Sequence, residues 1–340
     1  MKEWTVLGVV KAIGAVRAVG VVLCSLVLAS NVNAETYESH PEAKKLIAEM
    51  VNDHQYDEKK LQRIFSKAKK KQSILDAISR PAERTKTWAE YRPMFVNKTR
   101  ISKGLEFWKK HQEILKRSEQ IYGVPPEIIV AIIGVETMYG RQGGSYRVID
   151  ALSTLAFDYP KRPLFRRELI SYLLLVRKYD LDPMKIKGSY AGAMGYGQFI
   201  PSSYMNYAVD FDGDGFKDIW TSSEDAIGSV ANYIKRHGWK TGAPLVSRAR
   251  VNNKEVKEMA NETLKPGKTL AEWQALGIKA ASSEDYESSQ KAAFFKYQGR
   301  LGAEFWFGFD NFYTVTRYNH SRLYAMSVIQ LADEIKRQMP

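Results

Sequence analysis

Cysteine is almost absent from this sequence of 340 residues, in which Cys24 is the single example. It lies in an apolar run over residues 18–29 that follows scattered basic residues and precedes Ala34. This arrangement is typical of a secretory signal, and we expect cleavage after Ala34. The mature chain would then contain no cysteine, which excludes disulfides, thiol chemistry and cysteine metal sites and leaves stability to the core.

A long hydrophobic run is missing too. Residues 18–29 are fewer than the ~20 that a membrane-spanning helix needs, which disfavours an uncleaved membrane anchor. Leu23 precedes Cys24, whereas bacterial lipid-attachment signals generally place a small residue there. Lipid attachment is therefore the weaker interpretation, and we expect residues 1–34 to be a cleaved signal peptide.

Acidic residues are outnumbered, and motifs for nucleic-acid binding are lacking. Lys and Arg number 51 against 38 Asp and Glu, for a net charge of +13. This charge favours polyanionic partners, although a merely soluble basic surface is the alternative. Secretion and the absence of a phosphate-binding glycine loop argue against nucleic acid and leave anionic lipid or cell-wall polymers. The aromatic content of 12%, with 19 tyrosines, suits the stacking of sugar rings.

The run PPEIIVAIIGVETMYG at residues 125–140 predicts a buried helix that carries a carboxylate, Glu136. Prolines suit its start and glycine its end. The helical period places Glu136 on a stripe with Ile129, Ile132 and Ile133. Burial favours the protonated carboxyl, which is the form that the general acid of a glycosidase needs. The alternative is a structural carboxylate at a helix end or in an ion pair.

The remaining pattern is mostly helical. Amphipathic spacing predicts helices within residues 35–99, over residues 105–122 and 163–176, and over residues 225–237, with a terminal helix at residues 324–335. By contrast, alternation and aromatic-rich extended runs predict a small β-rich insertion, at residues 245–251, 292–297 and 305–315. Residues 316–319, TRYN, are expected at the start of the terminal helix.

The run DFDGDG at residues 210–215 matches the opening of a calcium loop, with oxygen ligands at alternate positions and glycine at the sharp turn. The twelfth position holds Thr221 instead of glutamate, so we expect a longer loop over residues 210–225. The expected ligands of a structural Ca²⁺ are Asp210, Asp212, Asp214, the Phe216 carbonyl and Asp225. The alternative is a chance cluster of acids in a turn.

The run GSYAGAMGYGQFIPSSY at residues 188–204 is rich in glycine, so its backbone can adopt positive φ angles and approach a ligand closely. Gln198 stands out as an amide beside an aromatic residue. An irregular loop without a ligand is the alternative.

Together these runs resemble one family, the membrane-bound lytic murein transglycosylase B family, or glycoside hydrolase family 103. The matching runs follow the family's order: GVETMYG, GSYAGAMGYGQFIPSSY, DFDGDG, DAIGSVANYIKRHGW and TRYNHSRLYA. The resemblance implies a mainly α (α+β) fold with a lysozyme-like catalytic core. It also implies a periplasmic enzyme acting on the glycan strands of peptidoglycan, with outer-membrane association left open. We expect a monomer, with cell-wall synthesis or division proteins as candidate partners.

By this resemblance Glu136 is the single catalytic acid and base. It would cleave the β-1,4 bond between N-acetylmuramic acid and N-acetylglucosamine and leave a 1,6-anhydromuramyl end. The residues that would line the glycan cleft are Tyr91, Ser189, Gln198, Tyr233, Tyr318, Asn319 and Tyr324.

The resemblance also suggests a domain organisation. A helical domain would span residues 35–104, the core residues 105–239 and the β-rich insertion residues 240–310, before residues 311–340 return to the core.

Two other functions stay open on the sequence. A lysozyme-type hydrolase needs a second carboxylate, for which Asp150 and Asp158 are candidates by proximity in sequence alone. A non-catalytic wall-binding protein would keep its whole activity without the Glu136 carboxylate.

Overall fold

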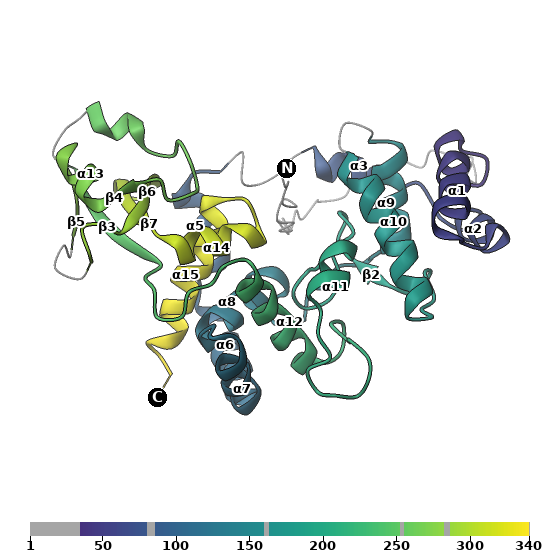
Figure 1. The fold of residues 1–340 in the computed structure, drawn as a ribbon, viewed down its shortest axis with the longest axis horizontal. Helices are drawn as coiled ribbons and strands as arrows, with labels where there is room; N and C mark the ends of the chain where they lie inside the picture. The colour runs from purple at the N-terminus through teal and green to yellow at the C-terminus, as the bar shows by residue number, and fades with distance from the viewer. Residues whose placement is uncertain (1–34, 80–85, 160–162, 252–254, 282–285, 340) are drawn as a thin grey trace, which may run out of the picture.

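The computed structural model describes residues 35–79, 86–159, 163–251, 255–281 and 286–339. The signal peptide expected at residues 1–34, with Cys24, lies outside this part of the chain. In the described ranges, no helix is long and apolar enough to span a membrane. The fold is mainly α-helical with a smaller β part, as predicted: a sheet of five strands and a short pairing of β1 (Tyr146–Arg147) with β2 (Lys187–Gly188). It is elongated, with the sheet at one end and α1 and α2 at the other (Figure 1).

One end of the molecule joins helices that are far apart in the sequence. They are α1 (Pro41–His54), α2 (Glu58–Phe65), α3 (Gln72–Ile78), α9 (Val148–Phe157) and α10 (Pro163–Lys178). α9 packs against α3 and α10, and α1 packs against α2. The Tyr56 hydroxyl donates to the Leu173 carbonyl at 3.2 Å, which ties α10 to the segment after α1. The predicted apolar face of α10, including Phe165 and Leu169, is buried.

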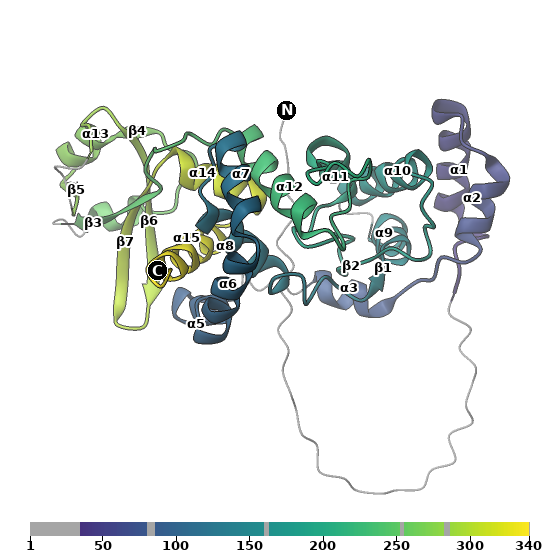
Figure 2. The ribbon, with the colours of Figure 1, turned by 90° about the horizontal axis from the view of Figure 1, so that it is seen from below.

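Helix α8 (Pro126–Thr137) lies at the centre of the other part, where α6 (Lys98–Lys110), α7 (Gln112–Tyr122), α12 (Ser223–Arg236) and α15 (Arg322–Lys336) pack around it (Figure 2). Every residue from Ile128 to Val135 is buried. The predicted stripe was therefore too narrow, because neighbours cover the helix on all sides. The helix also ends earlier than predicted, with Met138 in the left-handed conformation.

The helix predicted over residues 105–122 is in fact two helices. His111, with φ −117° and ψ 26°, separates α6 from α7. The predicted amphipathic spacing is interrupted there, so Phe107 and Leu115 are buried but Ile121 is 57% exposed. No proline or glycine marks the break in the sequence, which explains why the periodicity missed it.

The region predicted as one helical domain, residues 35–104, is divided between the two parts. α1 and α2 lie with α9 and α10, whereas α5 (Trp88–Phe95) packs against α15 and β6 (Lys291–Gly299). The predicted boundary after residue 104 falls inside α6. Amphipathic helices of similar composition serve both parts, so the sequence pattern does not separate them.

The predicted β-rich insertion forms an antiparallel sheet of five strands in the order β4-β6-β7-β3-β5. Besides β6, the strands are β3 (Val246–Val251), β4 (Lys268–Thr269), β5 (Ile278–Ala280) and β7 (Gly302–Gly308). The short helices η1 (Glu255–Met259) and α13 (Leu270–Ala275) accompany it. Trp273, Phe294 and Phe307 form a separate core beneath the sheet. Its own core explains why this segment can be inserted into a helical protein.

The extended run predicted over residues 305–315 was wrong beyond Gly308. The chain turns into α14 (Asp310–Tyr318), whose Phe312 and Val315 are buried at helical spacing. The aromatic content suggested a strand, but the three-residue period of the buried positions decides for a helix. TRYN therefore ends α14 instead of starting α15, and Ser321 caps α15.

The burial of α8 gives a stability prediction. Ile132 is fully buried, and truncation leaves a cavity, so Ile132→Ala should lower the free energy of unfolding by about 2–5 kcal/mol. Ile121→Ala, at an exposed position, should change it by roughly 0.5 kcal/mol or less. Urea unfolding of both variants measures this, and equal losses would contradict the central position of α8.

Candidate active site

Glu136 occupies the last turn of α8 and meets a tyrosine from α15. The Tyr324 hydroxyl donates a hydrogen bond to Glu136 Oε1 at 2.7 Å, across 188 residues of sequence. Tyr324 is fully buried, while Glu136 is half-buried. Burial and the negative charge of Glu136 raise the pKa of Tyr324 well above its usual value of 10.0. The phenol therefore stays protonated, and remains a donor, throughout the neutral range.

Two further tyrosines extend this contact into an aromatic wall. Tyr318 of α14 stacks on Tyr324 with ring centres 6.4 Å apart, and Tyr233 of α12 meets Tyr318 edge-on at 4.7 Å. Tyr318 donates to the Gly197 carbonyl at 2.5 Å and Tyr233 to the Arg317 carbonyl at 2.7 Å. Burial, and then the charge of Glu136, raise the pKa of Tyr318. The site thus presents neutral phenols around one carboxyl group.

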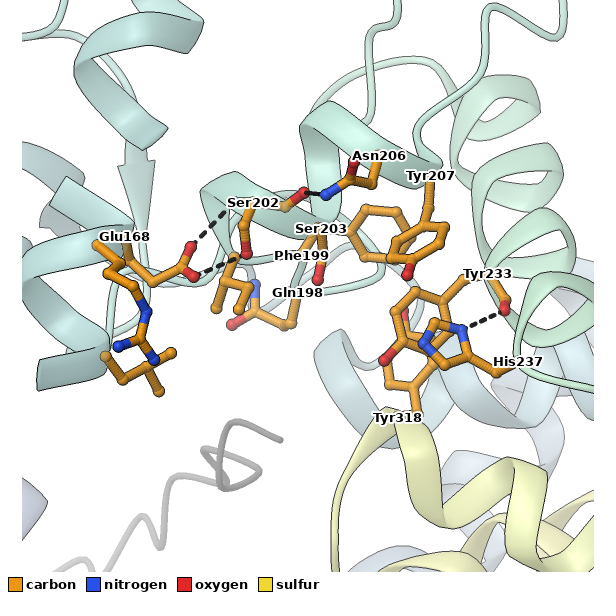
Figure 3. A pocket seen from close by; sticks show the side chains of 13 residues that line it. Glu168, Gln198, Phe199, Ser202, Ser203, Asn206, Tyr207, Tyr233, His237 and Tyr318 are labelled. Atoms are coloured by element: carbon orange, nitrogen blue, oxygen red, sulfur yellow. Dashed lines mark hydrogen bonds between the residues drawn. The ribbon is translucent and has the colours of Figure 1, made fainter. Parts of the chain in front are cut away.

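A cavity of about 260 Å³ lies beside this wall (Figure 3). Three of the predicted glycan-binding residues line it: Gln198, Tyr233 and Tyr318. In Figure 3, Tyr318 and Tyr233 lie on one side of the cavity and Glu168 on the other. Glu136 is not among the lining side chains, but its charge acts on Tyr318, which does line the cavity.

Several lining residues escaped the sequence prediction, namely Leu164, Arg167, Glu168, Phe199, Ile200, Ser202, Ser203, Asn206, Tyr207 and His237. Glu168 is 4% exposed and accepts from the Ser202 amide at 2.9 Å and hydroxyl at 2.7 Å. Its position between Phe165 and Tyr172 on the apolar face of α10 is the same signal that identified Glu136. The others have common residue types without a revealing spacing.

The glycine-rich run forms a compact loop between β2 (Lys187–Gly188) and α11 (Pro201–Tyr207). Gln198 has φ +52°, and its side-chain amide donates to the carbonyls of Gly143 and Gly195 at 3.2 and 3.0 Å. Ser189 is buried, and its hydroxyl accepts from the amides of Ala191 and Ala193. Ser189 thus supports the loop from inside, while Gln198 reaches the cavity.

Tyr91 and Asn319 are both buried, and neither is among the residues that line the cavity. Tyr91 lies close enough to Tyr324 to contribute to its raised pKa. Asn319 is 1% exposed, and neither its side-chain oxygen nor its nitrogen has a hydrogen-bond partner in the part of the chain that the structure describes. Buried amides normally have partners, so the carboxamide has capacity for a ligand.

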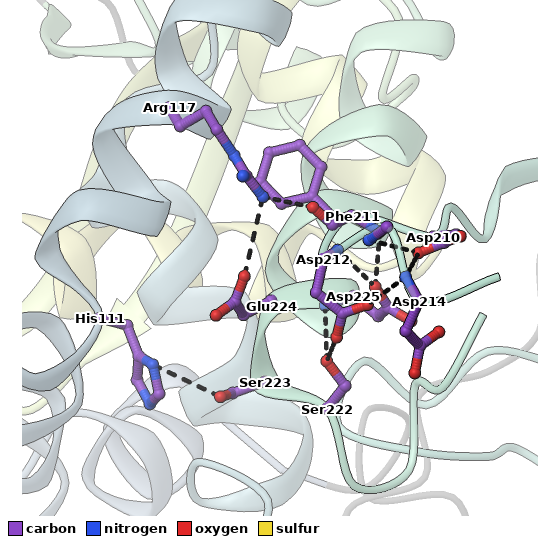
Figure 4. A network of polar contacts seen from close by, with 11 residues as sticks. His111, Arg117, Asp210, Phe211, Asp212, Asp214, Ser222, Ser223, Glu224 and Asp225 are labelled. Carbon is purple, nitrogen blue, oxygen red and sulfur yellow. Dashed lines mark hydrogen bonds and ion pairs between the residues drawn. The ribbon is translucent and has the colours of Figure 1, made fainter. Parts of the chain in front are cut away.

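The acidic loop brings Asp210, Asp212 and Asp214 together, with ligand oxygens within 4.8 Å of one another (Figure 4). Asp225 is fully buried beneath the loop. Its Oδ1 accepts from the Phe211 amide at 2.5 Å, and its Oδ2 from the Asp218 amide at 2.6 Å. Three predicted ligands therefore converge, whereas Asp225 holds the loop backbone and is not part of that cluster.

Comparison with known families supplies the identification. Residues 38–333 match the family model described as Transglycosylase SLT domain. The chain belongs to this family. It is 42% identical over 309 residues to the membrane-bound lytic murein transglycosylase B of Escherichia coli (strain K12), covering 88% of this chain and 84% of that relative.

Solved structures of other transglycosylases show the same fold. The catenated lytic transglycosylase SltB1 from Pseudomonas aeruginosa has a TM-score of 0.84 and 51% identity, over 88% of this chain and 99% of that one. The Escherichia coli lytic transglycosylase Slt35 in complex with calcium has a TM-score of 0.78 and 42% identity, over 87% and 93%. Pseudomonas aeruginosa SltB3 in complex with NAG-NAM-pentapeptide has a TM-score of 0.75 and 30% identity, over 89% and 80%.

The two acids that a hydrolase could use beside Glu136 form ion pairs and hydrogen bonds with other parts of the chain. Asp150 pairs with Arg147 at 2.8 Å and accepts from the Lys69 amide. Asp158 accepts from Tyr37 at 2.5 Å and pairs with Lys70 at 2.7 Å. Both acids thus fasten the amino-terminal segment onto α9.

The Tyr324–Glu136 contact generates a kinetic prediction. A hydrogen bond to a charged group contributes about 1.5–3 kcal/mol, so Tyr324→Phe should lower kcat roughly 10- to 100-fold. Tyr56→Phe removes another buried phenol hydroxyl, far from Glu136, and should leave kcat unchanged. Turnover of purified peptidoglycan measures both, and unaltered kcat in the Tyr324 variant would remove this tyrosine from the site.

Proposed function

We propose that this protein is a lytic murein transglycosylase in which Glu136 is the single catalytic acid and base. The observation that carries this assignment is the half-buried Glu136 carboxyl, held by Tyr324 beside a cavity walled with tyrosines. The family membership supports the reaction class. A relative of the same fold was solved with NAG-NAM-pentapeptide, which supports peptidoglycan as the substrate.

The reaction needs one group that first gives and then takes a proton. Protonated Glu136 donates its proton to the glycosidic oxygen as the bond to C1 of N-acetylmuramic acid breaks, and N-acetylglucosamine leaves as an alcohol. The resulting carboxylate takes the proton of the muramyl C6 hydroxyl, whose oxygen bonds to C1. Glu136 ends protonated as it began, and the 1,6-anhydro ring forms without water.

Glycan binding is assigned to the walls of the cavity. Gln198, Tyr233 and Tyr318 line it and offer an amide and two aromatic faces to sugar rings. We assign the unpartnered carboxamide of Asn319 to a hydroxyl or acetamido group of the substrate, since such a buried amide requires a partner. Ser189 supports the loop that carries Gln198, and Tyr91 lies near Tyr324.

The hydrolase alternative is disfavoured by the engagement of its acids. A hydrolase would need a second carboxylate to activate water or to act as nucleophile. Asp150 and Asp158 are bonded to the amino-terminal segment, and both oxygens of Glu168 accept from Ser202. None of the three is arranged to activate a water molecule beside Glu136.

We assign a structural Ca²⁺ to the loop over residues 210–225. Asp210, Asp212 and Asp214 supply converging oxygens, with the Phe216 carbonyl as a further ligand and Asp225 closing the loop from its buried side. The chemistry of the donors suits calcium, which prefers several oxygen ligands. The calcium complex of Slt35 supports the choice of ion.

The protein is placed in the periplasm, where its substrate lies, after removal of the signal peptide at residues 1–34. The apolar run near the amino terminus supports this localisation. A monomeric state and contacts with cell-wall synthesis or division proteins stay predictions.

The reaction is tested by mass spectrometry of fragments released from purified peptidoglycan. The chain from residue 35 to 340 should release fragments lighter by one water molecule than those of a hydrolase, and Glu136→Gln should release none. Glu127→Gln, at the other end of α8 and paired with Lys336, should keep full activity. Fragments with reducing ends would establish a hydrolase, and activity in the Glu136 variant would remove Glu136 from catalysis.

The calcium assignment is tested by thermal unfolding. Ca²⁺ at 100 times its dissociation constant should stabilise the fold by about 2.7 kcal/mol, and a chelator should reverse this. Asp214→Ala should abolish the response, whereas Asp53→Ala, an exposed acid in α1, should retain it. A transition temperature that does not respond to calcium would contradict the site.

A further inference from the structure

The turn that follows Glu136 is held in an unfavourable backbone conformation. Met138 and Tyr139 have φ angles of +51° and +59°, so consecutive residues with side chains adopt the left-handed region. Each such residue costs about 1 kcal/mol or more and persists where surrounding contacts enforce it. Because Glu136 lies directly before this turn, whatever holds the turn also fixes the direction of the catalytic carboxyl.

Tyr139 is anchored by contacts that leave little freedom. It is 7% exposed, and its hydroxyl donates to the Arg100 carbonyl of α6 at 2.9 Å. The hydroxyl fits between the backbones of α6 and α8: a Cβ atom added to Gly104 would lie 2.6 Å from it, and one added to Gly134 2.5 Å from it. Glycine at both positions thus makes room for this phenol.

Arg100 completes the arrangement from the same side. Its guanidinium is buried, with Nη1 donating to the Gly134 carbonyl and Nη2 to the Met94 carbonyl at 3.3 Å. Gly134 O also accepts from the Met138 amide at 3.1 Å, so the arginine binds the last turn of α8. A cation is favourable there, since the carbonyls at a helix end carry partial negative charge.

The charge of Arg100 acts on the carboxyl as well as on the backbone. Burial lowers the pKa of Arg100, and electrostatic interactions with Tyr139 and Glu136 oppose that shift. Glu136 is faced by Tyr324 from α15 and by Tyr318 from α14, both of which are neutral near pH 7. Arg100 is thus a cation whose charge acts on Glu136.

Charged groups also lie at the far end of α8. Lys336 of α15 pairs with Glu127 at 2.7 Å, and Glu119 of α7 has its pKa raised by burial and by Glu127. α12 contributes Tyr233, which bonds to the Arg317 carbonyl.

We propose that Arg100 and Tyr139 are positioning residues for Glu136. Together they hold the strained turn after α8, and Arg100 stabilises the carboxylate that forms when Glu136 has given its proton to the leaving group. The inference rests on the proposed role of Glu136, and neither residue touches the substrate.

The test compares pH profiles and stabilities of three variants. Arg100→Met should lower kcat at least about 10-fold and move the alkaline limb of the kcat profile up by about one pH unit, because loss of a nearby cation favours the protonated acid. Arg100→Lys should restore the position of the limb but only part of kcat, since lysine lacks the planar fork. Tyr139→Phe should lower kcat without moving the limb, because Arg100 remains. KM should change little in all three.

Controls separate positioning from folding. Arg63→Met removes an exposed cation from α2 and should leave kcat and the limb unchanged. Thermal unfolding gives the folded fraction of each variant. If Arg100→Met does not fold, Arg100→Lys and Tyr139→Phe decide between a positioning role and a loss of folding. Losses proportional to the folded fraction, with an unmoved limb, would overturn the proposal. Activity in Glu136→Gln would instead overturn the proposed function, whereas an inactive Glu136→Gln beside a normal Arg100→Met would overturn the positioning role alone.

Discussion

The main constraint on this structure is the free-energy cost of burying the Glu136 carboxyl group at the end of α8, a helix that its neighbours cover on every side. Burial disfavours the charged carboxylate unless hydrogen bonds compensate for lost water. Tyr324 supplies one such bond to Glu136, and the apolar residues of α8 fix the helix on which it stands. The helices around α8 come from three separate stretches of the sequence, residues 98–122, 223–236 and 322–336, so the site exists only once the chain has folded back on itself.

Tyr324 and Tyr318, which act on Glu136, are phenols and not carboxylates. Such neutral groups suit a reaction in which one residue performs both proton transfers. Neutral phenols orient the carboxyl group without adding a second carboxylate that could activate a water molecule. The rings of Tyr233 and Tyr318 also line the cavity to which we assign glycan binding. Glu168, which lines the cavity, accepts hydrogen bonds from the amide and the hydroxyl of Ser202. Binding surface and electrostatic environment are therefore provided by the same side chains.

The sequence pattern predicted those features that depend on residues close together in the sequence. Glu136 is detectable because a carboxylate in an apolar helix is rare, the acidic loop because its spacing is fixed, and the β-rich insertion because its alternation differs from its surroundings. The break at His111 was missed because tertiary packing interrupts a regular amphipathic spacing. The helix at Asp310–Tyr318 was missed because its aromatic content suggested a strand. The contact between Tyr324 and Glu136 spans 188 residues, so periodicity alone does not reveal it, and Glu168 was overlooked although it carries the signal that marked Glu136.

We propose that one carboxyl group performs the whole reaction and that water takes no part in it. Digestion of peptidoglycan in water labelled with heavy oxygen, followed by mass spectrometry of the muramyl ends, tests this most directly. The products of this protein should contain no heavy oxygen. Peptidoglycan digested in parallel by a lysozyme should carry one labelled oxygen atom at each new end. Heavy oxygen at the ends made by this protein would show that water attacks C1 and would contradict the single-residue mechanism.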